Sequence, residues 1–154
     1  MTVSGRCLCG GVRFELTETP ERLRFCHCES CKKLSGGAGT ANVRARSDSV
    51  RIVAGADLIQ TYQPAEGSAK SFCRTCGSNL FGGGWPASEH CSVRITTLDE
   101  PPRDLPVAHL YTRSVAPWET LPEDGGERFE TTSAWRASAC RASATACSAH
   151  SIAC

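Results

Sequence analysis

The chain has 154 residues, a formal net charge of +1 and 11 cysteines. Its length favours a single domain, and its charges are dispersed, so it lacks the basic surface that neutralises nucleic-acid phosphates. No run approaches the roughly 18 apolar residues of a membrane-spanning helix, and the first residues lack the apolar core of a secretory signal. We therefore expect a cytoplasmic protein that binds neither nucleic acid nor membranes.

The first half of the chain predicts short strands around a cysteine-rich segment. Apolar residues alternate with polar ones over 12–16, which is typical of a strand with one buried face. Residues 25–33 read FCHCESCKK, and a short helical turn is expected after Cys31. The same reasoning predicts strands at 50–52 and 58–62.

The second half repeats this arrangement. Residues 72–80 read FCRTCGSNL and precede the glycine loop 82–84. Alternation over 93–97 gives the clearest strand signal, and after the prolines between 101 and 106 another strand is expected at 107–111. Many short strands separated by glycine and proline indicate a mainly β fold.

The C-terminal end differs in composition. We expect a zinc-binding domain over residues 1–135 and a low-complexity tail of alanine, serine and cysteine over 136–154. Cys140, Cys147 and Cys154 are spaced by seven, which would align them on a helix as a third metal site. The scarcity of large apolar residues favours a disordered tail instead.

The spacing of the other cysteines indicates metal binding, because a reduced cytoplasmic chain this rich in cysteine more often holds metal ions than disulfides. Four thiolates make a closed structural zinc site, whereas three leave a position open for chemistry. The contiguous triple is a natural open site, and the two remaining pairs complete a closed one. The triple is Cys26, Cys28 and Cys31, and the pairs are Cys7 with Cys9 and Cys73 with Cys76.

Other interpretations of these residues stay open. Cys73 and Cys76 alone could form a redox dithiol, and four thiolates also suit iron or an iron–sulfur cluster. His27 could complete the triple, although a residue between two ligands is expected to point away from the metal into solvent. Cys91 stands apart and is expected to be a small buried side chain.

The ordered cysteine motifs resemble the glutathione-dependent formaldehyde-activating enzyme family, which also contains centromere protein V. The resemblance covers residues 4 to 130 and excludes the tail. It lies in three longer segments, supported by the short motifs TLD at 97–99, HLY at 109–111 and APW at 116–118. The longer segments are GRCLCGGVRFEL at 5–16, FCHCESCKKLSG at 25–36 and SFCRTCGSNLF at 71–81.

This resemblance implies a β-tent fold of short antiparallel sheets around a four-cysteine zinc site. It implies two zinc ions, a structural one on Cys7, Cys9, Cys73 and Cys76 and a catalytic one on Cys26, Cys28 and Cys31. The implied reaction joins glutathione and formaldehyde into S-(hydroxymethyl)glutathione, formally a carbon–sulfur lyase in reverse. One fold supports many activities, so the resemblance indicates the fold more directly than it indicates the substrates.

The role of each residue around the triple can be interpreted in two ways. Flanking cations could balance the thiolate charge or bind the carboxylates of glutathione, or they could be ordinary solvated charges. Three further residues could line a pocket or could serve in packing. The cations are Arg24, Lys32 and Lys33, and the candidate pocket residues are His109, Tyr111 and Trp118.

Two functional classes therefore remain. One is an enzyme that acts on the adduct of a thiol and a small aldehyde, and the other is a non-catalytic binding or scaffold module stabilised by zinc. The complete triple favours the enzyme, because a scaffold needs only the four-cysteine site.

Overall fold

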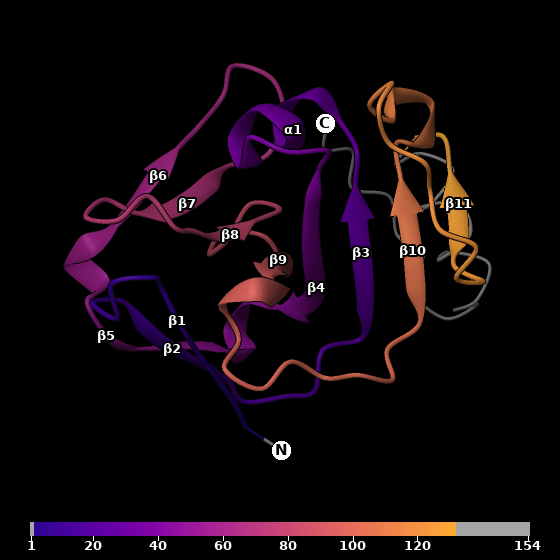
Figure 1. Ribbon diagram of the computed structural model, residues 1–154. Helices are drawn as coiled ribbons and strands as arrows, with labels where there is room; N and C mark the ends of the chain where they lie inside the picture. Colours follow the sequence, from indigo (N-terminus) through magenta and orange to yellow (C-terminus); the bar gives the residue numbers. More distant parts are fainter. Residues whose placement is uncertain (1, 132–154) are drawn as a thin grey trace. The chain divides into compact units, whose positions relative to one another are not determined.

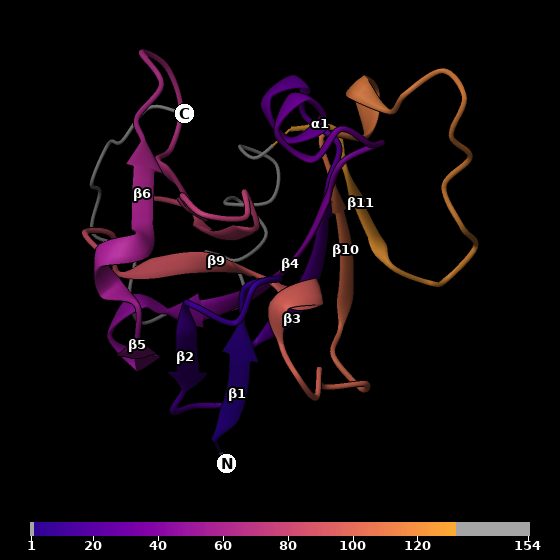
Figure 2. The same ribbon diagram turned by 60° about the vertical axis from the view of Figure 1, so that its left-hand side comes forward.

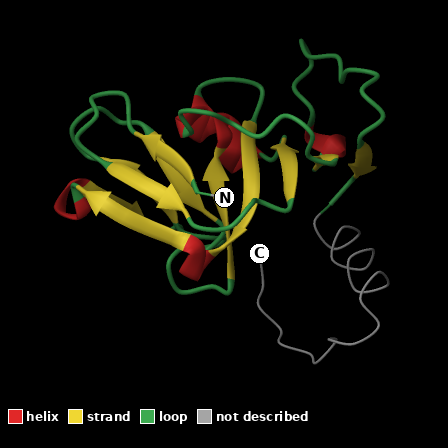
Figure 3. Ribbon diagram, turned by 90° about the horizontal axis from the view of Figure 1, so that it is seen from below, coloured by secondary structure: helices red, strands yellow, loops and turns green. Residues whose placement is uncertain are grey.

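The computed structural model describes residues 2–131. Over these residues the chain consists mainly of short β-strands, drawn in yellow in Figure 3, and it contains one α-helix besides short 3-10 helices. The predicted mainly β fold is thereby confirmed. These residues divide into two compact units, one formed by residues 2–23 and 41–106, the other by residues 24–40 and 107–131.

The first unit contains two sets of antiparallel strands. In one set β2 lies between β1 and β5, and Figure 2 shows β1 and β2 next to each other. The other set follows the order β4-β9-β8-β7-β6. The strands are β1 (Val3–Arg6), β2 (Arg13–Leu16), β4 (Thr40–Arg46), β5 (Val50–Ala54), β6 (Ile59–Tyr62), β7 (Lys70–Cys73), β8 (Asn79–Gly82) and β9 (His90–Arg94).

The hydrophobic core of this unit is built by the inward faces of these strands. Phe14 of β2 and Phe81 of β8 are fully buried, and their rings meet edge to face with centroids 5.0 Å apart. Complete burial of such a side chain stabilises a fold by about 1.5–3 kcal/mol. Cys91 belongs to the same core, as expected for a small apolar side chain, and so do Cys7 and Cys73.

The second unit holds β3 (Arg22–Cys26), which begins at the boundary, α1 (Glu29–Ser35), β10 (Val107–Leu110) and β11 (Glu127–Phe129). Figure 1 shows β3, β10 and β11 side by side with their arrows pointing the same way. The pairing of β10 with β11 is parallel, so the described residues contain this parallel pair beside the antiparallel ones.

Individual elements agree with the sequence to different degrees. The strand expected over 12–16 appears as β2. The strand expected over 93–97 ends at Arg94, because Ile95–Thr97 form a 3-10 helix in which the N–H of Leu98 donates to the carbonyl of Ile95 at 3.1 Å. Further 3-10 helices are Ser47–Ser49, Ala56–Leu58 and Thr112–Ser114.

The helical turn expected after Cys31 is a longer helix that starts earlier, at Glu29, and therefore contains Cys31. No helix within residues 2–131 is long and apolar enough to cross a membrane. The expected boundary at residue 135 and the tail with its three cysteines lie outside the described residues.

Candidate metal centres

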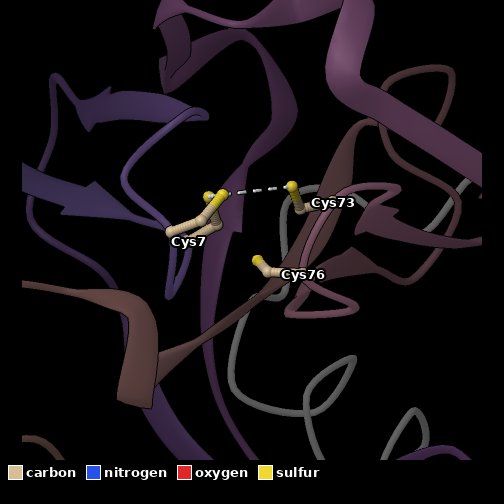
Figure 4. Close-up of side chains that lie close together, drawn as sticks. Cys7, Cys73 and Cys76 are labelled. Carbon is tan, nitrogen blue, oxygen red and sulfur yellow. Dashed lines mark hydrogen bonds between the residues drawn. The ribbon is translucent and has the colours of Figure 1, made fainter.

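The first unit brings together Cys7, Cys9, Cys73 and Cys76, whose sulfur atoms all lie within 4.8 Å of one another. Figure 4 shows the sulfur atoms of Cys7, Cys73 and Cys76 directed toward a common point. The Sγ of Cys9 is 3.4 Å from that of Cys7 and 3.9 Å from that of Cys73. Tetrahedral zinc with bonds of about 2.3 Å places its sulfur ligands about 3.8 Å apart, so the observed spacing fits the ion.

Two tight turns deliver these four thiols. One joins β1 to β2 and the other joins β7 to β8, and in each a glycine with positive φ follows the second cysteine, Gly10 with φ 73° and Gly77 with φ 74°. The glycine N–H groups donate to the carbonyls of Cys7 and Cys73 at 3.0 and 2.8 Å. Nothing lies within 4 Å of a Cβ added at either glycine, so the left-handed backbone is what requires glycine here.

Backbone and hydroxyl groups complement the sulfur atoms. The N–H of Val12 donates to the Sγ of Cys7 at 3.2 Å. The hydroxyl of Ser78 lies 3.3 Å from the Sγ of Cys76 and accepts from the N–H of Leu8 at 2.9 Å, which ties the two turns together. Hydrogen bonding with Ser78 lowers the pKa of Cys76 to about 5, so this cluster favours a thiolate before any ion binds.

The second unit brings together Cys26, Cys28 and Cys31, with sulfur atoms again within 4.8 Å of one another. Cys26 ends β3, Cys28 is the extended residue that caps α1, and Cys31 lies in the first turn of that helix. The change from strand to helix within six residues turns all three side chains to one point.

The hydrogen bonds of this triad suit a cation. The thiol of Cys26 donates to the Sγ of Cys28 at 3.5 Å. Hydrogen bonding from Cys26 and then Cys31 lowers the pKa of Cys28 to about 2, and the same contact with Cys28 raises the pKa of Cys26. Only one thiolate is therefore stabilised by the other thiols, and three together need a bound positive charge. The donor set fits zinc with one ligand position left over.

His27 is not where the sequence placed it. The expectation that it faces solvent is wrong, because only 3% of it is exposed. Its Nδ1 lies 3.2 Å from Glu119 Oε2, and its Nε2 lies 3.3 Å from Nδ1 of His109. The expectation that it points away from the three sulfur atoms holds, since both ring nitrogens are engaged elsewhere. Its partners are 92 and 82 residues away in the chain, so no local pattern could reveal them.

The structure also locates other residues that the sequence suggested around the cysteine triad. Lys32 is not an ordinary solvated charge, because its Nζ donates to the carbonyl of Ser114 at 2.7 Å and pairs with Glu29 at 2.6 Å. His109 is buried and its Nε2 lies 3.0 Å from Asp124 Oδ2. Tyr111 has a left-handed backbone with φ 60°, and Trp118 is 77% exposed, which excludes a packing role for Trp118 within its unit.

Comparisons with known proteins agree with these features. The profile of the family described as glutathione-dependent formaldehyde-activating enzyme matches residues 2–114. A curated protein of Halomonas elongata that bears the same enzyme name is 32% identical over 132 residues, which cover 77% of this chain and 80% of that protein.

A crystal structure of a Rhodobacter sphaeroides protein shares the fold. It aligns with a TM-score of 0.52 and 24% identity over 82% of this chain and 98% of that one. The matched family profile spans both cysteine clusters, and the chain therefore belongs to the glutathione-dependent formaldehyde-activating enzyme family.

Proposed function

We propose that the protein is a zinc-dependent enzyme that joins a thiol, with glutathione as the first candidate, to a small aldehyde such as formaldehyde. The sulfur–carbon bond forms as the thiol adds to the aldehyde carbonyl, and the thiol proton ends on the new hydroxyl. The reverse step makes it a lyase of the carbon–sulfur type. Reduced thiols are essential to this role, which suits the cytoplasm.

The observation that carries the proposal is the convergence of three sulfur atoms in the second unit, a cluster to which residues 2–131 contribute no fourth ligand. A four-thiolate site is saturated, whereas a three-thiolate site leaves one position for a substrate. Zinc held by Cys26, Cys28 and Cys31 would bind a substrate thiol as its thiolate at neutral pH. The four cysteines of the first unit would hold a second, structural zinc ion.

The three thiols of the second unit would hold the ion, and the substrate thiol bound there would lie beside the aldehyde. Cys28 contributes the sulfur atom whose pKa is lowest in the triad, and Cys26 and Cys31 are held beside it by the end of β3 and the start of α1. Formaldehyde is a small and reactive electrophile, so placing it beside a bound thiol is the main requirement for the reaction.

The test compares rates, because thiols and formaldehyde also react without an enzyme. Exchange between free glutathione and its hydroxymethyl adduct, followed by NMR, should accelerate with the native protein and return to background with Cys28→Ser. Cys147→Ser, which removes a thiol of the C-terminal tail and keeps all seven cysteines of the two clusters, is the matched control and should keep the native rate. Glutathione alone should also raise the melting temperature, because it binds the folded state.

A negative result identifies the alternative. If millimolar glutathione neither accelerates exchange nor shifts melting while both clusters hold zinc, the glutathione assignment fails. A screen of other thiols then separates a different substrate from a non-catalytic binding or scaffold module, which would bind metal and accelerate nothing.

A further inference from the structure

We propose that four residues outside the cysteine triad, Glu119, His27, His109 and Asp124, form a positioning device that sets the spacing of the triad's sulfur atoms. We name them the His–carboxylate quartet. The inference rests on the proposed function in taking the triad as the reactive centre. It assigns a role to two buried histidines that the proposed chemistry does not otherwise use.

The quartet is a continuous chain of three contacts within the second unit. Glu119 Oε2 lies 3.2 Å from His27 Nδ1, His27 Nε2 lies 3.3 Å from His109 Nδ1, and His109 Nε2 lies 3.0 Å from Asp124 Oδ2. All four imidazole nitrogens are engaged. The two imidazole rings are nearly parallel, with 16° between their planes and centroids 5.6 Å apart, and Phe25 stacks against His109 with centroids 5.2 Å apart.

Burial makes these contacts specific. His27 and His109 are 3% and 1% exposed, whereas the two carboxylate side chains at the ends are 26% and 27% exposed. A buried imidazole that loses its partner leaves an unsatisfied polar atom, so each ring tolerates only the orientation that keeps both contacts. The orientation of His27 is therefore fixed from both ends.

Fixing His27 fixes the triad, because His27 lies between Cys26 and Cys28 in the chain. Its backbone N–H also donates to the carbonyl of Leu110 at 3.0 Å, which attaches the end of β3 to β10. The residue is thus held by its backbone and by both ring nitrogens. The backbone of Cys26 and Cys28, one residue away on either side, is thereby held in the position from which their sulfur atoms approach to 3.5 Å.

The geometry argues against two other roles. Neither imidazole is a ligand, because the cluster within residues 2–131 consists of three cysteines and both nitrogens of each ring are turned to other partners. Nor does the quartet deliver protons into the triad, because it ends on a carboxylate at each side. Its effect on the sulfur atoms passes through the backbone of residues 26–28.

Substitutions can separate hydrogen bonding from packing. His109→Phe keeps a stacking ring of similar size and removes both contacts of His109. Asp124→Ala removes the outer acceptor at the more exposed end, so it carries the test if His109→Phe does not fold. Asp124→Asn keeps an acceptor oxygen for His109. Glu123→Ala is the matched control, since Glu123 is the adjacent acid, its side chain is 95% exposed and it pairs with Arg128 outside the quartet.

Two measurements report the spacing. Competition with a chromophoric chelator gives the zinc affinity of the weaker site. In protein stripped at that site, capture of phenylarsine oxide requires converging thiols, whereas alkylation by iodoacetamide requires only one accessible thiol. A general loosening of the fold raises alkylation, while a loss of positioning lowers arsenical capture and leaves the alkylation rate unchanged.

We expect His109→Phe and Asp124→Ala to weaken zinc binding and arsenical capture by about tenfold, with Asp124→Asn largely restored and Glu123→Ala unchanged. Native arsenical capture in both disabling variants would overturn the inference, even if the native protein binds zinc and accelerates exchange. If the native triad captures the arsenical and the variants do not, but no zinc binds and no exchange is accelerated, the proposed function fails and the positioning role stands.

Discussion

The two cysteine clusters solve the same geometric problem in different ways. The four thiols of the first unit come in pairs separated by 64 residues between Cys9 and Cys73, and each pair sits in a glycine turn between strands. The three thiols of the second unit come from a single stretch in which a strand becomes a helix. One cluster therefore needs the folded sheet to assemble, and the other is nearly local.

Because of this difference, we expect the first cluster to matter mainly for stability and the second mainly for chemistry. A metal ion on the first cluster would link β1–β2 to β7–β8 and would lose those links only when the unit unfolds. A metal ion on the second would join residues that are already close in the chain, so it adds little to the fold. That site depends instead on surrounding contacts such as those of His27 to keep its geometry.

The largest expected effect comes from breaking the first cluster. Structural zinc contributes about 10 kcal/mol or more to the folding of small metal-binding domains, which is comparable with the whole stability of an ordinary domain. Cys73→Ser should therefore unfold the protein or make it insoluble, whereas Cys28→Ser should remain folded. Thermal melts followed by circular dichroism compare the two, and equal loss of structure would refute this division of roles.

A smaller effect is expected from chelation. Protein prepared under reducing conditions should contain close to two zinc ions, one for each cluster. A mild chelator should first remove the ion of the triad with no change in circular dichroism, and the second should leave only as the fold is lost. Elemental analysis during the titration checks the order. One zinc or fewer in the starting protein, or iron in its place, would contradict the two-site arrangement.

The smallest effect is expected from the C-terminal segment. Truncation after Trp135 removes three cysteines but few large apolar side chains. The melting temperature and the zinc content should both stay unchanged, because the seven cysteines of the two clusters are retained. A fall of several degrees, or the loss of an ion, would show that the segment packs or binds metal and would argue for the third site.

Cysteine spacing predicted both clusters, because metal ligands leave short and rigid signatures in sequence. The strand at 12–16 was also predictable, since its buried and exposed residues alternate in hydrophobicity. The longest strand, β4, was not predicted. It buries Thr40 and Asn42 on one face and Val43 and Ala45 on the other, so no alternation of apolar and polar residues marks it in the sequence.

The environment of His27 lay beyond sequence reasoning for a different reason. A histidine between two metal ligands is ordinarily exposed, and nothing in FCHCESCKK indicates a partner. Its burial depends on Glu119 and His109, which β10 and the following loops bring close only in the folded unit. The same limit applies to Ile95–Thr97, where a turn of 3-10 helix interrupts an alternating pattern.

The confinement of the triad to residues 26–31 has an evolutionary consequence. One nucleotide change in this short stretch would remove a ligand of the proposed reactive centre and leave all four cysteines of the sheet cluster in place. The reverse change would restore that ligand on a scaffold that we expect to remain folded. Under the proposed roles, activity and folding would depend on separate sets of cysteines, so activity could be lost or regained without passing through an unfolded protein.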